Sequence, residues 1–184
     1  MFYGKLLPHN EYVNDIATTV CFTGHRTRSH QELFMDKKRS AALQEALYHA
    51  SIKAYGMGYR TFITGMADGV DMLAGMAVIQ LMHTCPDVEL IGALPYVVPT
   101  KSRNDDHRKD FEFREICNYA HKIYYLSNNI YTGVYHVRNR FMLSHSSLLI
   151  AAYDTSIAEG GTVSTIKEAK RRGIEILPVE IDDF

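Results

Sequence analysis

The sequence predicts a three-layer, Rossmann-like α/β fold, with a mostly parallel, doubly wound sheet of about six strands and helices on both faces. Short apolar runs alternate with longer helix-like segments, as a parallel sheet with covering helices requires. The apolar runs are too uniform for strands with one wet face, which indicates strands buried on both sides. A length of 184 residues lies in the one-domain range. We therefore expect one domain over residues 1–184, with its core at about 18–179.

The expected strands are residues 18–22, 61–64, 88–93, 122–126, 148–152 and 175–179. The expected helices are residues 38–55, 70–81, 104–119, 135–146 and 162–172. Segment 70–81 has the strongest helical signal, because its apolar side chains repeat at i, i+3, i+4 and i+7, as on an amphipathic helix. Gly56 and Gly58 are expected to end the first helix, and Gly173 suits the left-handed position after the last one. Residues 1–16 and 99–109 are expected to be irregular.

Composition and charge argue against several classes of protein function. The formal net charge of −1 removes the simplest argument for nucleic-acid binding, although a local basic patch is compatible with it. The apolar runs are shorter than the roughly 20 residues that cross a bilayer, and the N-terminus has no signal-peptide core, so we expect a cytoplasmic protein. Cys21, Cys85 and Cys117 are widely spaced and are expected to be reduced. The histidine spacings predict no metal site.

Ligands of open parallel sheets bind at the carboxyl ends of the strands, so the loops that follow the strands hold the candidate site. The loop after the first strand contains Thr23, Gly24, His25 and Arg26. Its imidazole and guanidinium suit the holding of an anion and the transfer of a proton. The alternative is a tight turn with exposed polar side chains.

The expected strand 61–64 ends at Thr64 and is followed by Gly65, and then by Asp68 and Asp71 near the positive end of a helix. We expect Asp68 to cap that helix, whereas Asp71 is equally suited to a cap or to a ligand contact.

The third loop begins at Asp154 and leads to Gly160, Gly161, Thr162 and Thr165. Glycine amides and hydroxyls there converge on one helix N-terminus, which favours a phosphate. In the alternative, the glycines only turn the chain and Thr162 only caps the helix.

Arg138 and Arg140 lie two residues apart on an expected helix, so they project about 200° apart and one of them should face the crevice. The sequence pattern does not show which of the two arginines faces the crevice, and we expect it to be Arg138. Five tyrosines could stack on a base, but with 12 in the chain ordinary packing explains most of them. The five are Tyr124, Tyr125, Tyr131, Tyr135 and Tyr153.

These motifs, in this order, resemble the SLOG superfamily, which contains DprA and the LOG phosphoribohydrolases, and most of all its YpsA-like branch. The residues that carry the resemblance are 21–26 (CFTGHR), 62–71 (FITGMADGVD), 138–140 (RNR), 149–154, Gly160, Gly161, Thr162 and Thr165. The resemblance implies a Rossmann-like sheet, a nucleotide-type ligand in the crevice and a homodimer. It does not settle whether the protein is an enzyme.

Three functions follow as hypotheses. The first is a binding or sensing domain for a phosphate-bearing nucleotide derivative, of the ADP-ribose type for example, with no cofactor required. The second is a LOG-like nucleotide N-glycosidase, for which Asp71, Glu159, Glu168 and His25 are the catalytic candidates. Glu168 falls one residue later than the glutamate of the LOG motif, a slip of about 100° on a helix. The third is a DprA-like module that handles single-stranded DNA.

Overall fold

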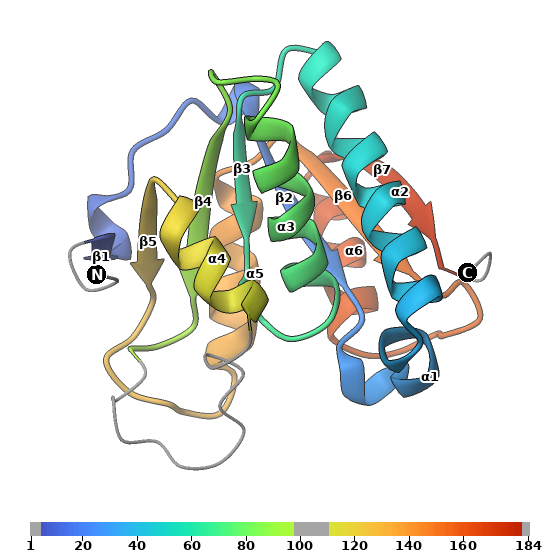
Figure 1. Cartoon of the computed structure of the whole chain (residues 1–184). Coiled ribbons are helices and arrows are strands. Elements are labelled where there is room, and N and C mark those ends of the chain that lie inside the picture. Colours follow the sequence, from blue (N-terminus) through green and yellow to red (C-terminus); the bar gives the residue numbers. More distant parts are fainter. Residues whose placement is uncertain (1–4, 98–110, 182–184) are drawn as a thin grey trace.

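A computed structural model describes residues 5–97 and 111–181 of the chain. Its seven described strands form one sheet in the order β1-β5-β4-β3-β2-β6-β7, and all the pairings are parallel (Figure 1). The strands are β1 (Leu6–Pro8), β2 (Thr19–Gly24), β3 (Thr61–Thr64), β4 (Glu89–Leu94), β5 (Lys122–Tyr125), β6 (Leu148–Tyr153) and β7 (Glu175–Glu180). The predicted fold class is confirmed.

Strand β1 is the exception to the sequence prediction, because it lies in a segment expected to be irregular. It has only three residues and pairs only with β5 at the edge of the sheet. Three residues are too few to show a strand periodicity. Pro8 ends the strand at this edge, where proline removes no bond from a central ladder.

The helices are α1 (Gln31–Met35), α2 (Lys37–Gly56), α3 (Val70–Met82), α4 (Phe111–Tyr119), α5 (Val134–Ser144) and α6 (Gly161–Arg171). The short α1 was not predicted, and residues 104–110 of the predicted helix 104–119 lie outside the described residues. A glycine with positive φ follows both α2 and α6, Gly58 with φ 101° and Gly173 with φ 69°. The sequence predicted the left-handed position of Gly173 and the end of α2 at this glycine pair.

The sheet is the middle of three layers, with α2, α3 and α4 on one face and α5 and α6 on the other (Figure 1). Alternate strand residues point into two apolar clusters. Phe22 and Phe62 pack with α2 and α3, whereas Cys21 and Ile63 pack with α5 and α6. The strands from β2 to β6 are therefore largely buried on both faces, as their uniform apolarity indicates. The expectation is wrong for the edge strand β7, in which only Val179 is buried, because an edge strand has less cover. No helix of the described residues is long and apolar enough to span a membrane.

Helix α3 differs from the prediction in how it is buried. The sequence pattern predicts an amphipathic helix, but α3 lies between α2 and α4 and above the sheet. Most of its residues are consequently buried, and Gln80 is its exposed position. A helix enclosed on three sides has no continuous wet face, so the prediction of amphipathicity was wrong.

The order of the strands determines where a ligand can bind. From β2 the chain adds β3, β4 and β5 outward on one side, then returns to place β6 on the other side of β2. The loops that leave β2 and β6 therefore diverge to opposite faces of the sheet. Such a switch point opens a crevice at the carboxyl ends of the two strands.

The three cysteines differ in accessibility, and this leads to a labelling prediction. Burial raises the pKa of the Cys21 thiol and that of the Cys117 thiol to about 12. Cys85 is only half-buried. We expect a thiol reagent at about pH 8 to label Cys85 first in the native protein, since thiolate is the reactive form. Cys85→Ser should remove the fast phase, and equal rates for all three thiols would contradict the described burial.

Candidate functional site

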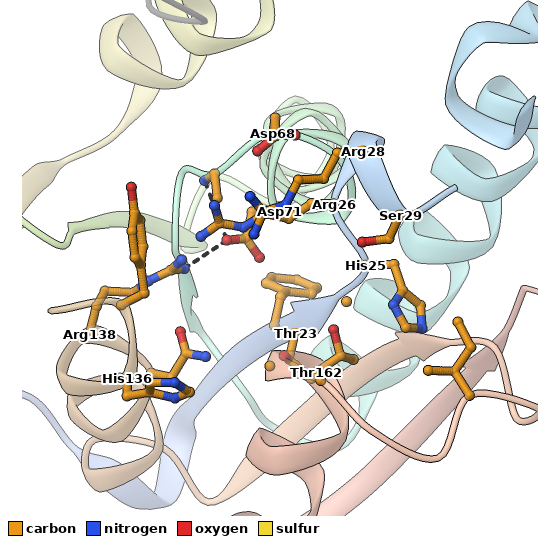
Figure 2. Close-up of a pocket in the computed structure, with 18 of the residues that line it drawn as sticks. Thr23, His25, Arg26, Arg28, Ser29, Asp68, Asp71, His136, Arg138 and Thr162 are labelled. Atoms are coloured by element: carbon orange, nitrogen blue, oxygen red, sulfur yellow. Dashed lines mark hydrogen bonds and ion pairs between the residues drawn. The ribbon is translucent and has the colours of Figure 1, made fainter. Parts of the chain in front are cut away.

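A cavity of about 440 Å³ lies at the carboxyl ends of β2 and β6 (Figure 2). Its walls come from the loop after β2, the loop before α3, the first turns of α5 and the start of α6. It lies at the switch point of the sheet, and its volume is typical of small-molecule sites. The cavity thus unites segments that are far apart in the sequence.

The end of β2 contributes Thr23 and Gly24, and the loop after it contributes His25 and Arg26; all four line the cavity. This loop lies directly on the start of α3. The backbone N–H of Val70 donates to the carbonyl of His25 at 3.1 Å. Gly69 has φ 85°, and a Cβ on it would lie 2.5 Å from that carbonyl oxygen. Only glycine permits this contact. The hydrogen bond from Val70 to His25 also occupies the first amide of α3, which is therefore not available to a ligand.

A buried ion pair forms one wall of the cavity. Arg138 Nη1 donates to Asp71 Oδ2 at 2.7 Å, and the two side chains are only 5% and 9% exposed (Figure 2). The amide of Ala67 also donates to Asp71 Oδ2, at 3.3 Å. Arg138 Nε is buried and has no acceptor among the described residues. The pair with Asp71 therefore does not use all the donors of this guanidinium.

The residues just before α3 help to position the ion pair between Arg138 and Asp71. A Cβ on Gly65 would lie 1.2 Å from Arg138 Nη1, so the glycine leaves the space that the guanidinium fills. The Thr64 hydroxyl donates to the backbone carbonyl of Asp71 at 2.7 Å. Thr64 and Gly65, which we expected to contact the ligand, are not among the residues that line the cavity.

The structure distinguishes Arg138 from Arg140 and corrects the role expected for Asp68. Arg138 lies in the cavity wall, whereas Arg140 is exposed outside it. The prediction that Asp68 caps α3 is wrong. The N-cap residue is Gly69, and no described side chain makes a capping hydrogen bond at this end of the helix. The Val70 amide already donates to His25. Both Asp68 and Asp71 line the cavity.

The N-terminus of α6 opens into the cavity on the side of β6. Gly160 is its N-cap with φ 121°, and no side chain in the described part of the chain caps it. The amides of the first turn, which include those of Gly161 and Thr162, have no intrahelical acceptor. Among the described residues, nothing lies within 4 Å of a Cβ built on Gly160 or Gly161. This positive helix end is thus open to an anion.

Thr165 stabilises this region without lining the cavity. Its hydroxyl donates to the carbonyl of Gly161 at 2.8 Å and accepts from Asn139 Nδ2 at 2.9 Å. Asn139 belongs to α5 and lines the cavity. Thr165 therefore joins the starts of the two helices that face the site.

The carboxylates proposed for catalysis lie in different places. Glu159 lines the cavity and is exposed, whereas Glu168 lies outside it and contacts Arg171 and Arg172. A hydrogen bond from Arg172, together with the charge of Arg171, holds the pKa of Glu168 below its usual range. The slip relative to the LOG motif thus directs this glutamate to the surface.

Asp154 also lies beside the cavity. Its Oδ1 accepts from the amide of Ser156 at 2.8 Å and from the Ser156 hydroxyl at 2.6 Å. Its Oδ2 lies 3.4 Å from Nε2 of His30, whose ring lies against that of His25 with the two planes tilted by 36°. Within residues 5–97 and 111–181, no three His, Cys, Asp or Glu side chains are placed to hold a metal ion.

Several cavity residues were missed by sequence reasoning. Arg28 and Ser29 extend the loop after β2 beyond the four residues considered, and reading the loop to its end would have found them. His136 and Asn139 share the first turns of α5 with Arg138, but a helix has no sequence signal for the side that faces a cavity.

Of the five tyrosines considered for base stacking, Tyr135 lines the cavity. Arg26 Cζ lies 4.5 Å from the centre of its ring.

The comparisons with known proteins agree with the motifs. No curated protein matches the chain. The model of the YspA SLOG family matches residues 20–183, which include nearly all of β2, every later strand and each segment that lines the cavity. The resemblance to the SLOG superfamily is therefore confirmed. The chain belongs to the YspA SLOG family.

Proposed function

We propose that the protein binds a nucleotide or a nucleotide derivative, of the ADP-ribose type for example, and serves as a binding or sensing domain. The observation that carries the proposal is one cavity at the switch point that contains both an open helix N-terminus and a buried arginine. In this proposal, a phosphate lies at the first-turn amides of α6 and faces Arg138. Helix N-termini and arginines are both groups that suit phosphate binding.

Among the described residues, three cations and three carboxylates line the cavity, so individual cations, and not a net positive charge, support an anionic ligand. The cations are Arg26, Arg28 and Arg138, and the carboxylates are Asp68, Glu159 and Asp71, which pairs with Arg138. A shallow hollow of about 610 Å³ continues from Glu159 and Gly160 along α6. That hollow is lined by Lys167, Lys170 and Arg171, which add positive charge beside the site. Clustered cations of this kind attract phosphate-bearing ligands.

The rest of the cavity suits the nucleoside part of the ligand. Phe22 and Ile157 are apolar lining residues, and Tyr135, a residue that is 36% exposed, adds an aromatic ring. Stacking on such a ring tolerates different bases. The ligand would then lie with its phosphate toward α6 and its base toward α5.

The charge variant Gly161→Asp tests this proposal. We expect it to weaken the binding of ADP-ribose or AMP more than tenfold in calorimetry, because a carboxylate would stand where the phosphate binds. It should not destabilise the fold, since an acidic side chain in the first turn of a helix contributes about 0.3–1 kcal/mol.

Gly161→Ala is the matched control. It adds the same Cβ without charge, into space that the described residues leave open, and should change the affinity much less. Equal binding by the wild type and Gly161→Asp would show that the ligand does not contact the N-terminus of α6. Absence of heat from AMP, NAD and ADP-ribose with the wild type would contradict the proposal itself.

The second candidate function is hydrolysis of an N-glycosidic bond, and the presence of Glu159 and Asp71 in the cavity favours it. A carboxylate there could stabilise an oxocarbenium-like transition state. Asp71 is bound by Arg138, which leaves Glu159 as the better placed group. Chromatography of the calorimetry mixtures for free base, with Glu159→Gln as the comparison, separates hydrolysis from binding alone.

A further inference from the structure

Asn139 on α5 belongs to a short chain of hydrogen bonds that ends at the start of α6. The Thr165 hydroxyl donates to the backbone carbonyl of Gly161 at 2.8 Å, and Asn139 Nδ2 donates to the Thr165 hydroxyl at 2.9 Å. Asn139 lines the cavity, whereas Thr165 does not. The starts of the two helices lie side by side at the cavity, where Arg138 marks α5 and Thr162 marks α6 (Figure 2).

This chain of hydrogen bonds determines which way the Asn139 amide faces. A carbonyl oxygen only accepts, so the single hydroxyl hydrogen of Thr165 belongs to the bond with Gly161. The Thr165 oxygen is then left to accept, and Asn139 must present its NH₂ group to it. The carbonyl oxygen Oδ1 of Asn139 therefore lies on the side of the amide that is turned away from Thr165.

The Oδ1 atom of Asn139 is open to the cavity. Among residues 5–97 and 111–181, no group donates a hydrogen bond to it, and it is not one of the buried polar atoms that lack a partner. Asn139 itself is half-buried and lines the cavity. The amide thus offers a hydrogen-bond acceptor of fixed direction to whatever occupies the cavity.

An amide oxygen has a different preference from the groups that suit a phosphate. Arg138 and the first-turn amides of α6 are donors, and the oxygens of a phosphate accept from them. The Asn139 oxygen cannot donate, so it needs a ligand group that carries a hydrogen, such as a hydroxyl. A ligand that brings only acceptors to this point would leave the amide oxygen unsatisfied.

The position of Asn139 indicates which part of a nucleotide it meets. Tyr135 and Asn139 are spaced i, i+4, so they lie one turn apart on the same face of α5, and both line the cavity. On its other side, Asn139 is joined through Thr165 to Gly161, at the helix end proposed for the phosphate. Asn139 therefore lies between the proposed base end and the proposed phosphate end of the ligand.

In any nucleotide the ribose connects the base to the phosphate, and its hydroxyls are the donors of that part. We infer that Asn139 Oδ1 accepts a hydrogen bond from a hydroxyl of the ligand's ribose, and that Thr165 is the positioning residue that aims the amide. The site then selects nucleotides that carry this hydroxyl over analogues that lack it. This inference rests on the proposed function and specifies the sugar of the ligand.

The test is calorimetry with AMP, 2′-deoxy-AMP and 3′-deoxy-AMP, which share the base and the phosphate. For the wild type we expect at least one deoxy analogue to bind about tenfold more weakly than AMP, because the amide oxygen then loses water without gaining a donor. The analogue that binds more weakly identifies the hydroxyl that is recognised. The ratio of the affinities is the readout, since a loss of stability alone would change all three affinities alike.

Four variants assign the preference to the amide and to its direction. Asn139→Ala should bind AMP as weakly as the deoxy analogue, so that the ratio falls to about one. Thr165→Val keeps the volume but removes the hydroxyl, and the ratio should also fall although Asn139 is present. Thr165→Ser keeps the hydroxyl and should keep the ratio. Asn118→Ala is the control, because Asn118 is exposed on α4, outside the cavity, and its amide bonds to Glu115.

Each outcome decides between the inference and its alternatives. Equal binding of the three mononucleotides by the wild type, or binding of ADP-ribose without binding of AMP, overturns the inference alone and leaves the proposed function standing. A preference for AMP that persists in both Asn139→Ala and Thr165→Val assigns the hydroxyl to another residue and also overturns it. If Asn139→Ala does not fold, the contrast between Thr165→Val and Thr165→Ser decides. Absence of binding of every nucleotide by the wild type contradicts both proposals.

Discussion

Replacing Arg138 by methionine is expected to lower the free energy of unfolding by about 3–5 kcal/mol and to abolish ligand binding. The reason is that Asp71 would remain buried without its cation, and the loss of one partner from a buried pair costs about this much. Methionine fills much of the volume of the arginine stem, so that the effect reports the charge more than a void. Urea unfolding measures the first effect, and calorimetry with ADP-ribose measures the second.

The double variant Asp71→Asn with Arg138→Met is the control for this prediction. It removes both charges, and the new amide oxygen can still accept from Ala67, so most of the lost stability should return. Ligand binding should not return, because the guanidinium is still absent. Recovery of binding together with stability would show that Arg138 only holds Asp71 and does not bind the anion.

Replacing Gly69 by alanine should lower the free energy of unfolding by about 2–4 kcal/mol. Two costs combine, since the backbone at φ 85° disfavours any side chain, and the new Cβ would lie 2.5 Å from the carbonyl oxygen of His25. The backbone atoms of Arg26 and Thr27 are also close, at 2.9 Å, so the loop after β2 must move as a whole. Thermal unfolding measures the loss, and we also expect weaker binding of ADP-ribose.

Gly56→Ala is the matched control for Gly69→Ala. Gly56 is the last residue of α2, and no described residue lies within 4 Å of a Cβ built there. Alanine in a helix is favoured over glycine by about 0.5–1 kcal/mol, so this variant should be as stable as the wild type or more so. If Gly69→Ala behaved in the same way, the loop after β2 would not rest on α3 as described.

Most of the fold could be predicted from the sequence because the signals for it are local and repeated. Uniform apolar runs indicated the six long strands, and Gly58 and Gly173 marked the ends of two helices. The elements β1 and α1 were missed because three and five residues are too short to show a period. The enclosure of α3 depends on its neighbours α2 and α4, which no pattern within α3 itself can reveal.

The candidate site was predictable as a set of loops but not in the role of each residue. Thr23 lies near the end of β2, His25 follows that strand and Thr162 lies in the first turn of α6, and all three line the cavity. Gly65 lies in an equally suggestive loop, yet it makes room for Arg138 instead of facing the cavity. A sequence does not distinguish a glycine that offers its amide to a ligand from one that leaves space for a side chain. That distinction needs the positions of both partners.

The crossing from β5 back to β6 also determines when the cavity can form during folding. Strands β2 to β5 each pair with the next in the chain, so this part of the sheet depends on contacts of moderate sequence separation. The pairing of β2 with β6, by contrast, closes a loop that spans most of the chain. Such distant contacts form slowly, because the loop entropy is lost before the contact is gained. A truncated or nascent chain that lacks β6 and α6 would therefore lack one wall of the cavity, and in the proposed function ligand binding would report that the last part of the polypeptide, from β6 onward, has docked.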